Sequence, residues 1–226
     1  MKSTLVVGDV HLGSAHCRAE SFSRFLDSLP ADAELVLNGD ILDYWRPLPP
    51  AHAQALEKVK AEARQGRAVT WIRGNNDDDL RLPNAESIRF VSEYAPASDP
   101  DVLIAHGHAF DRLLHGSLLF VLPARILHGL RHLAGRPSIH VAQYARRWTP
   151  LFDWLKGRIV RRALRHARNR GFRIIVCGHT HYAEDVSMDG IRYLNPGCWT
   201  EDSNYCVEIR NGQAALRSVA GDGPEV

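Results

Sequence analysis

The chain has 226 residues, which is enough for one large domain or two small ones and for a substantial hydrophobic core. Its 45% hydrophobic and 24% charged residues are ordinary for a soluble globular protein. No apolar run approaches the roughly 18 residues that span a bilayer and no signal peptide is recognisable, so a membrane-spanning or secreted protein is not expected.

Charge is distributed unevenly along the chain. Residues 112–173 hold 14 Lys or Arg and one acidic residue, Asp153, leaving 14 basic and 25 acidic residues elsewhere. The basic segment favours an anionic partner: nucleic acid, a phosphorylated ligand or an acidic lipid surface. The four cysteines form no Cys-x-x-Cys pair, so neither a zinc knuckle nor a redox motif is indicated. Free thiols in a reducing cytoplasm are expected.

The hydrophobic pattern predicts alternating strands and helices. In chain order we expect a strand at 4–7, a helix at 21–29, a strand at 34–37, a helix at 51–65, and strands at 68–72, 88–91 and 102–105. A helical segment over 112–171, with a long last helix at 151–170, is followed by a strand at 172–177 and hairpins at 184–194 and 205–219. We expect one α/β domain, residues 1–226, with 112–171 inserted as a helical cap.

Polar residues follow four successive strands and one later strand at the point where each strand ends. The set contains two carboxylates, one amide and four imidazoles: Asp9, His11, Asp40, Asn75, His106, His179 and His181. Any one of them could be a turn or surface residue, but open α/β sheets bind ligands at the carboxyl ends of their strands. Oxygen and imidazole ligands suit Mn, Fe, Zn or Ni better than Ca.

Seven ligands are too many for one catalytic ion that must keep an open position. They suit two ions about 3.5–4 Å apart that share one carboxylate. Such a pair acidifies a bridging water and binds the attacking and leaving oxygens of a displacement at phosphorus.

The pieces GDVH, GDILD, GNND, HGH and GHTH occur in this order between Gly8 and His181. Together they resemble the calcineurin-like metallophosphoesterase family, whose fold is a four-layer αββα sandwich. The resemblance implies that Asp9, His11 and His181 hold one ion, that Asn75, His106 and His179 hold the other, and that Asp40 bridges them. It further implies that Asp43 and Asp77 orient the ligands, and that the ions are Mn²⁺, with Fe, Zn, Ni or Mg as alternatives. Glycines before the motifs, such as Gly39 and Gly74, are expected to permit tight turns.

GDILDYW, HGHAFD, the helical insertion and NPGCWTED resemble more narrowly the UDP-2,3-diacylglucosamine pyrophosphohydrolase branch. That branch implies hydrolysis of UDP-2,3-diacylglucosamine to UMP and 2,3-diacylglucosamine 1-phosphate in lipid A synthesis, in the cytoplasm and at the inner membrane surface. Two positions depart from the branch: Asn76 stands where Arg is usual, and His108 stands where Asp is usual.

These departures bear on the leaving group. Because position 76 holds Asn and not a histidine, it offers no proton to the leaving group. A leaving group that needs no proton is therefore favoured, such as a phosphate monoester, whose second pKa is about 6. His108 or His16 could supply a proton and remove this preference. Asp40, Asn75, Asn76 and His108 are therefore the candidate catalytic residues.

Substrate contacts are expected from His16 and from basic residues of the insertion, although arginines on a helix are often simply solvated. The candidates are Arg146, Arg147, Arg158, Arg161 and Arg162. Apolar residues between them suit a lipid tail with a phosphate head, or interfacial docking.

Three readings remain open. The first is a dimetal pyrophosphohydrolase of a nucleotide-linked lipid. The second is a metallophosphoesterase of another nucleotide or nucleic-acid phosphodiester, which the basic segment allows. The third is a non-catalytic scaffold, which the complete ligand set argues against. No protein partner is predicted.

Overall fold

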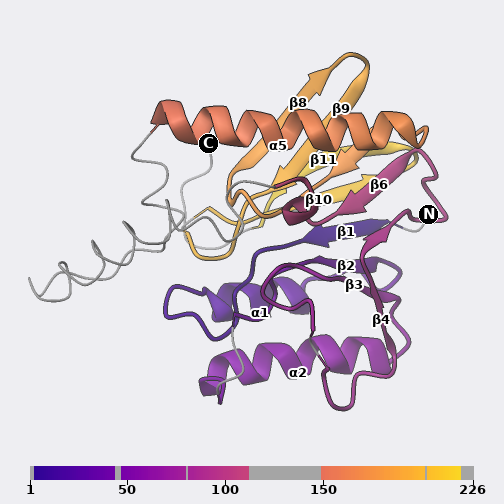
Figure 1. Ribbon diagram of the computed structural model, residues 1–226. Helices are drawn as coiled ribbons and strands as arrows, with labels where there is room; N and C mark the ends of the chain where they lie inside the picture. Colours follow the sequence, from indigo (N-terminus) through magenta and orange to yellow (C-terminus); the bar gives the residue numbers. More distant parts are fainter. Residues whose placement is uncertain (1–2, 44–46, 80, 112–148, 202, 220–226) are drawn as a thin grey trace, which may run out of the picture.

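Two β-sheets face each other and helices cover their outer faces (Figure 1). The computed structural model describes residues 3–43, 47–79, 81–111, 149–201 and 203–219. In the first sheet, the strand order is β11-β10-β1-β2-β3-β4; in the second, it is β5-β6-β7-β9-β8. The first sheet comprises β1 (Thr4–Val7), β2 (Glu34–Asn38), β3 (Val69–Ile72), β4 (Ile88–Val91), β10 (Tyr205–Arg210) and β11 (Gln213–Ser218). The second comprises β5 (Glu93–Tyr94), β6 (Val102–Ala105), β7 (Ile174–Val176), β8 (Ala183–Met188) and β9 (Ile191–Pro196).

The central strands are buried on both faces, which explains their continuous apolar runs. Val6 of β1 and Val36 of β2 point between the sheets, where they pack with residues of the second sheet such as Ile104. Their neighbours Val7 and Leu37 point the other way, into the layer beneath the first two helices. Alternation along a strand thus serves two separate cores at once.

Helices α1 (Ala19–Asp27) and α2 (Pro50–Arg64) cover the outer face of the first sheet. Helix α1 buries Phe22 and Phe25, whose rings lie 5.2 and 5.5 Å from the ring of Trp199. Helix α2 has Pro50 at its first position, where a backbone N–H would have no partner within the helix, so its absence costs no hydrogen bond.

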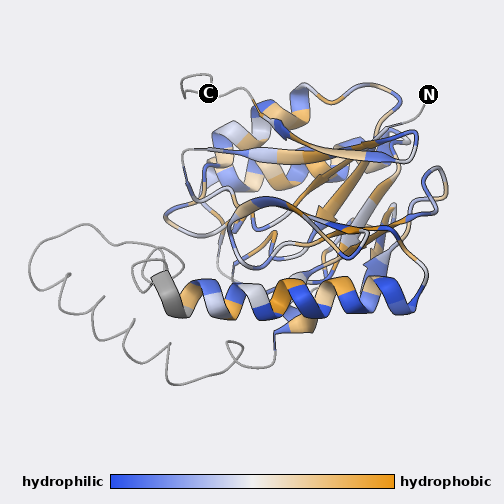
Figure 2. Ribbon diagram, turned by 90° about the horizontal axis from the view of Figure 1, so that it is seen from above, coloured by the Kyte–Doolittle hydropathy of each residue, from blue (hydrophilic) through white to orange (hydrophobic). Residues whose placement is uncertain are grey.

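Helix α5 (Thr149–Asn169) covers the outer face of the second sheet. Its buried residues Ile159 and Ala163 pack against Leu103 and Tyr193. Apolar and polar residues alternate along this helix in Figure 2, as expected for a helix with one buried side. The four layers therefore run α-β-β-α, and the predicted fold class is confirmed.

The predicted insertion, residues 112–171, divides into two parts. Residues 112–148 lie outside the described residues. The remainder is largely α5, which from Leu155 onward is a packed layer of the sandwich rather than an appendage to it. Among the helices that the structure describes, none is both long and apolar enough to cross a membrane.

Two short elements at the edges of the second sheet were not predicted. Strand β5 has only two residues, and the chain reaches it from β4 through Ser92, so the segment passes from one sheet to the other. The 3₁₀ helix η1 (Gly107–Phe110) follows β6 directly. Both are too short for hydrophobic periodicity to reveal them.

Candidate metal centre

The seven predicted ligands meet at one edge of the sandwich. Strands β1, β2 and β3 are parallel in the first sheet, and β6 and β7 are parallel in the second, so within each sheet these strands end on the same side. A cross-sheet hydrogen bond joins the two groups of strand ends, since the backbone N–H of His179 donates to Asp9 Oδ2 at 2.8 Å. The loop after β1 is fixed to the loop after β2, because Asp9 N donates to Gly39 O at 3.0 Å.

Asp9, His11 and His181 form the first buried cluster. His11 Nε2 lies 3.1 Å from His181 Nε2, and His181 Nε2 lies 3.3 Å from Asp9 Oδ1. Ligand atoms that each bind one ion at about 2.0–2.2 Å stand roughly 3 Å apart. The side chains present therefore fit a divalent ion at this point.

Asp40, His106 and His179 form the second cluster, with ligand atoms that all lie within 4.8 Å of one another. His106 Nε2 lies 3.7 Å from Asp40 Oδ1. Asn75 Oδ1 is buried and accepts no hydrogen bond within the part of the chain that the structure describes. A buried carbonyl oxygen without a partner is costly, and a cation is one group that satisfies it.

Acceptors on the far side of the ring orient His11, His106 and His179. His11 Nδ1 lies 3.2 Å from Asp43 Oδ1, and His106 Nδ1 lies 2.8 Å from the carbonyl oxygen of Asn38. His179 is reversed: its Nε2 lies 2.9 Å from Oδ2 of buried Asp111. A ring N–H donated outward leaves the other nitrogen as a metal ligand, so His11 and His106 present Nε2 and His179 presents Nδ1.

Asp111 is the residue that sequence reasoning missed. It belongs to the HGHAFD piece but follows a 3₁₀ turn whose geometry brings it back under His179, 68 residues away in sequence. Its place in the HGHAFD piece was the only signal available in the sequence, and that signal does not identify its partner.

Asp77 acts on the backbone of the site rather than on an imidazole. Its carboxylate accepts hydrogen bonds from Gly74 N at 2.5 Å, Ile41 N at 2.9 Å and Trp71 Nε1 at 3.0 Å. These bonds connect the loops after β2 and β3, which carry Asp40 and Asn75. Burial raises the pKa of the Asp77 carboxyl, against the lowering effect of the two backbone N–H donors.

The ligand backbone is strained. Five of the seven predicted ligands have positive φ: Asp9 at 52°, His11 at 55°, Asp40 at 51°, His179 at 75° and His181 at 56°. Such values are uncommon outside glycine, and they tend to cluster at functional sites. Five positive φ values among the seven ligands of the two clusters indicate a site whose backbone is held by the surrounding structure.

The glycines serve the site in two ways, which corrects the expectation that they all permit tight turns. Gly39 has the positive φ of 75° that such a turn requires. Gly74 does not have a positive φ, but it has no room for a side chain, since a Cβ there would lie 2.2 Å from Asp40 Oδ1.

Charges in the two clusters stabilise one another. Burial alone would raise the pKa of Asp9 and Asp40, but His181 lowers that of Asp9 and His106 lowers that of Asp40. Burial alone would lower the pKa of His106, but the hydrogen bond to Asp40 raises it to about 9. The two buried carboxylates are thus stabilised by the positive charge of the histidines beside them. Bound divalent ions can supply that positive charge instead.

Two further predicted residues lie beside the clusters. The backbone N–H of Asn76 donates to Asp40 Oδ1 at 2.9 Å, and its side-chain amide donates to Asp43 Oδ1 at 3.3 Å. The ring of His108 lies 5.2 Å from that of His106 and 6.5 Å from that of His179. Both residues could therefore approach a group bound at the clusters.

The predicted substrate contacts are described only in part. His16 is half-buried in the loop between β1 and α1. On α5, Arg158 lies over the ring of Trp154 at 4.8 Å, Arg161 is exposed, and Arg162 donates to the carbonyl oxygen of Phe110 at 3.0 Å. Arg146 and Arg147 are outside the described residues.

An αββα sandwich with two adjacent Asp/His clusters at its strand ends defines a metal-dependent phosphoesterase with a candidate dimetal site. The family model for calcineurin-like phosphoesterases matches residues 2–183. The chain therefore belongs to the calcineurin-like phosphoesterase family.

Several solved structures are similar to the chain at low identity. A predicted phosphoesterase from Streptococcus pneumoniae is 15% identical, with 96% of this chain and 97% of that chain covered and a TM-score of 0.42. An archaeal phosphodiesterase is 11% identical, with coverage of 96% and 99% and a TM-score of 0.48. Vps29 from Entamoeba histolytica, complexed with Zn²⁺, is 14% identical, with coverage of 96% and 98% and a TM-score of 0.48.

Comparison with curated proteins finds no match. The family is thus shown by the family model. The narrower resemblance to the UDP-2,3-diacylglucosamine pyrophosphohydrolase branch goes beyond that model and remains a proposal.

Proposed function

We propose that the protein is a dimetal phosphodiesterase that acts on a nucleotide or on a nucleic-acid phosphodiester. The observation that carries the proposal is the pair of buried Asp/His clusters at adjoining strand ends. Two divalent ions bound there would stabilise charge on a phosphoryl group and acidify a water. We propose Mn²⁺ as the resident ion, because the donor set mixes carboxylate, amide and imidazole.

Each ligand has a proposed place. Asp9, His11 and His181 hold one ion, and Asn75, His106 and His179 hold the other. Asp40 bridges them, which is supported by its electrostatic interaction with both His106 and His11. Asn76 keeps Asp40 in position through its backbone N–H.

His108 favours a diester whose leaving group needs a proton. It is half-buried beside His106, and an imidazole is the side chain best able to transfer a proton near neutral pH. The departure at Asn76 therefore does not leave the site without a proton donor. A phosphodiester with an alcohol leaving group is consistent with this arrangement.

The metal requirement is tested first. Chelator-treated protein should show no hydrolysis of bis(4-nitrophenyl) phosphate, and added Mn²⁺ should restore activity with two ions per chain measured by plasma mass spectrometry. A chain that binds no transition metal and hydrolyses no diester with Mn²⁺, Zn²⁺ or Mg²⁺ would overturn the proposal.

The role of His108 needs a comparison of leaving groups. The nitrophenolate group leaves without being protonated, whereas an alkoxide leaving group needs a proton. His108→Gln should slow cleavage of an alkyl phosphodiester by about 10²–10⁴-fold, the range for general acid catalysis, and should change the nitrophenyl substrate little. Equal loss on both substrates would show that His108 is not the proton donor. His16→Gln is the matched comparison for the second candidate donor.

A second candidate is the hydrolysis of UDP-2,3-diacylglucosamine to UMP and 2,3-diacylglucosamine 1-phosphate. One observation favours it: Trp154 on α5 is 49% exposed and lies beneath Arg158, an apolar and cationic pair that suits a lipid with a phosphate head. In this reading, residues 112–171 contain the lipid-contacting cap of a single domain and the protein works in the cytoplasm at the inner membrane surface. Failure to release UMP from this substrate with Mn²⁺, while diester cleavage persists, would exclude it.

A further inference from the structure

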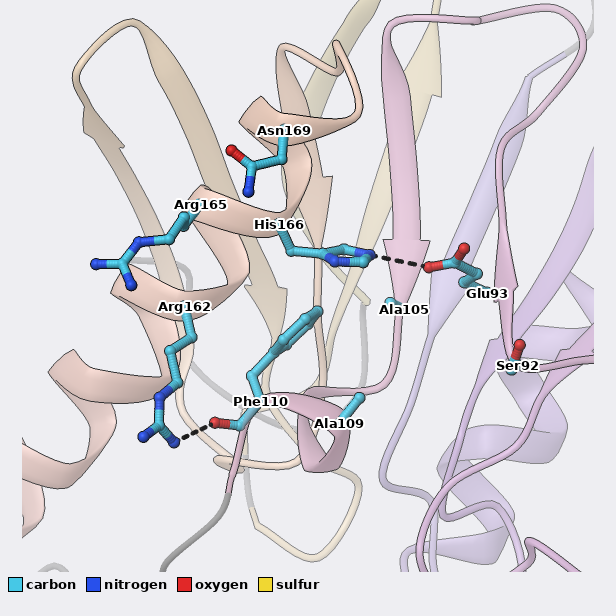
Figure 3. Close-up of a pocket in the computed structure, with 9 residues that line it drawn as sticks. All are labelled: Ser92, Glu93, Ala105, Ala109, Phe110, Arg162, Arg165, His166 and Asn169. Carbon is cyan, nitrogen blue, oxygen red and sulfur yellow. Dashed lines mark hydrogen bonds and ion pairs between the residues drawn. The ribbon is translucent and has the colours of Figure 1, made fainter.

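A pocket of about 650 Å³ lies between α5 and the edge of the second sheet, on the outer face of that sheet. Figure 3 shows its lining, which comes from α5, β5, the end of β6 and η1. The lining residues are Ser92, Glu93, Ala105, Ala109, Phe110, Arg162, Arg165, His166 and Asn169. None of the seven predicted metal ligands lines it.

One side of the pocket is cationic. Arg162, Arg165, His166 and Asn169 follow one another at helical spacings of three, one and three residues, so they share one side of α5. Arg162 donates one N–H to the carbonyl oxygen of Phe110, which anchors its side chain beside the pocket; its other donors have no further partner among the described residues. Arg165 is exposed, and no hydrogen bond or ion pair engages it among the described residues, which are 3–43, 47–79, 81–111, 149–201 and 203–219.

The single acidic lining residue does not balance this charge. Glu93 already pairs with His166, at 3.1 Å, and with Arg170. Its carboxylate is therefore engaged by two partners of its own. Within the part of the chain that the structure describes, the guanidinium of Arg165 and the remaining donors of Arg162 are available to an anion from solvent. A planar guanidinium matches the oxygens of phosphate.

The floor of the pocket is apolar. Ala105 and Phe110 are buried, and the Phe110 ring lies 5.3 Å from the ring of His166. Figure 3 shows the Phe110 ring beneath the His166 ring, with the side chains of Arg162 and Arg165 to the left of both. An aromatic wall next to unengaged guanidinium donors fits a ligand that combines a ring or apolar body with a phosphate group.

We propose that this pocket binds a phosphate monoester carried on an apolar or ring-bearing body, at a site separate from the metal centre. The phosphate contacts Arg165 and Arg162, and the body lies against Phe110. The pocket adjoins the metal centre through η1, because Ala105 precedes His106 and Phe110 precedes Asp111.

The probe for this site is phenylphosphonate, which has a ring, an anionic head and a P–C bond that hydrolysis does not cleave. We expect the metal-loaded protein to bind it at two sites by calorimetry, and chelator-treated protein to retain one. Arg165→Glu should weaken the retained site by at least about tenfold, the factor for loss of one charge-assisted hydrogen bond. Arg165→Lys should restore part of that loss.

Arg165 is the residue to change first because the described structure gives it no structural contact, so its variants should fold normally by circular dichroism. Arg168→Glu is the matched comparison, since Arg168 lies on the same helix but contacts Asp189 instead of the pocket. Equal affinity of wild type and Arg165→Glu for phenylphosphonate after metal removal would overturn the proposal. So would an equal loss in Arg168→Glu, which would show a general charge effect.

Vesicles distinguish a soluble ligand from a lipid headgroup with the same phosphate. Phosphatidic acid vesicles present the monoester on a membrane, and phosphatidylcholine vesicles lack it. Selective binding to phosphatidic acid that Arg165→Glu abolishes, while Arg168→Glu does not, supports the site with a lipid-borne ligand. If Arg165→Glu changes neither vesicle binding nor phenylphosphonate binding, the proposed site is contradicted. The retained site is measured without metal, so it stands or fails independently of the proposed phosphodiesterase activity.

Discussion

Replacing Asp111 by alanine would remove the carboxylate that orients His179. Oδ2 of Asp111 lies 2.9 Å from His179 Nε2, and the two side chains are 3% and 14% exposed. Water therefore replaces the lost acceptor poorly, and a buried donor left without a partner costs about 1–3 kcal/mol. The variant should unfold at a lower temperature, and its His179 ring should be free to rotate.

The larger effect falls on the second metal cluster. Partners that orient a metal-bound imidazole are typically worth about 10–100-fold in metal affinity. That range corresponds to about 1.4–2.8 kcal/mol of binding free energy. Asp40, His106 and Asn75 remain in place, so the cluster should be weakened rather than abolished.

The measurement is the Mn²⁺ concentration that half-activates hydrolysis of bis(4-nitrophenyl) phosphate. We expect this concentration to rise about 10–100-fold in Asp111→Ala, with most of the maximal rate recovered at saturating Mn²⁺. Asp185→Ala is the comparison, because that carboxylate pairs with Arg192 on an exposed part of the second sheet. It should leave the activation curve unchanged.

Half-activation of folded Asp111→Ala within about twofold of the wild-type Mn²⁺ concentration would contradict a positioning role for Asp111. So would saturating Mn²⁺ that restores no activity while both ions are bound. In that second case, Asp111 would act on the reaction itself and not on the position of His179.

Three other outcomes follow from the structure. Asp40→Ala should remove most activity and lower the bound metal below two ions per chain; activity within a few-fold of wild type would contradict a bridging carboxylate. Gly74→Ala should unfold more easily by about 1–3 kcal/mol and lose metal, because its Cβ would lie 2.2 Å from Asp40 Oδ1. Gly157→Ala, in helix α5, should instead raise the free energy of unfolding by up to about 1 kcal/mol. Denaturant unfolding measures both changes. Burial and the hydrogen bond to Glu34 raise the pKa of Tyr94 to about 12, so stability should be full below pH 10 and fall from pH 10 to 12, less so in Tyr94→Phe.

The strand ends were predictable because two simple signals coincide there. An apolar run marks a buried strand, and the first polar side chains after it, such as Asp9 and His106, mark where the strand stops. Parallel strands then place their ends together without any further information from the sequence. The hairpins at the carboxyl end were predictable for a similar reason, since Asp189 and Asn211 with positive φ precede glycines in tight turns.

Other features depend on tertiary packing that local patterns do not encode. Runs buried on both faces look alike whichever sheet they join, so the pattern alone could not assign Val36 and Ile104 to different sheets. Helix α5 reads as a basic helix, and only its contacts with Leu103 and Tyr193 make it a structural layer. Asp111 faces His179 because a 3₁₀ turn intervenes, a geometry without a sequence period.

The left-handed backbone at Asp9, His11, Asp40, His179 and His181 has a practical consequence for engineering this protein. Each of these residues costs of order 1–3 kcal/mol in a conformation that glycine adopts freely. Glycine would relieve that cost, although at Asp9 and Asp40 it would also remove acceptors of backbone N–H hydrogen bonds. A library selected only for heat resistance could therefore accept glycine at a ligand histidine, and each such change would delete a proposed metal ligand, so a stabilised version should be built with these five codons held constant.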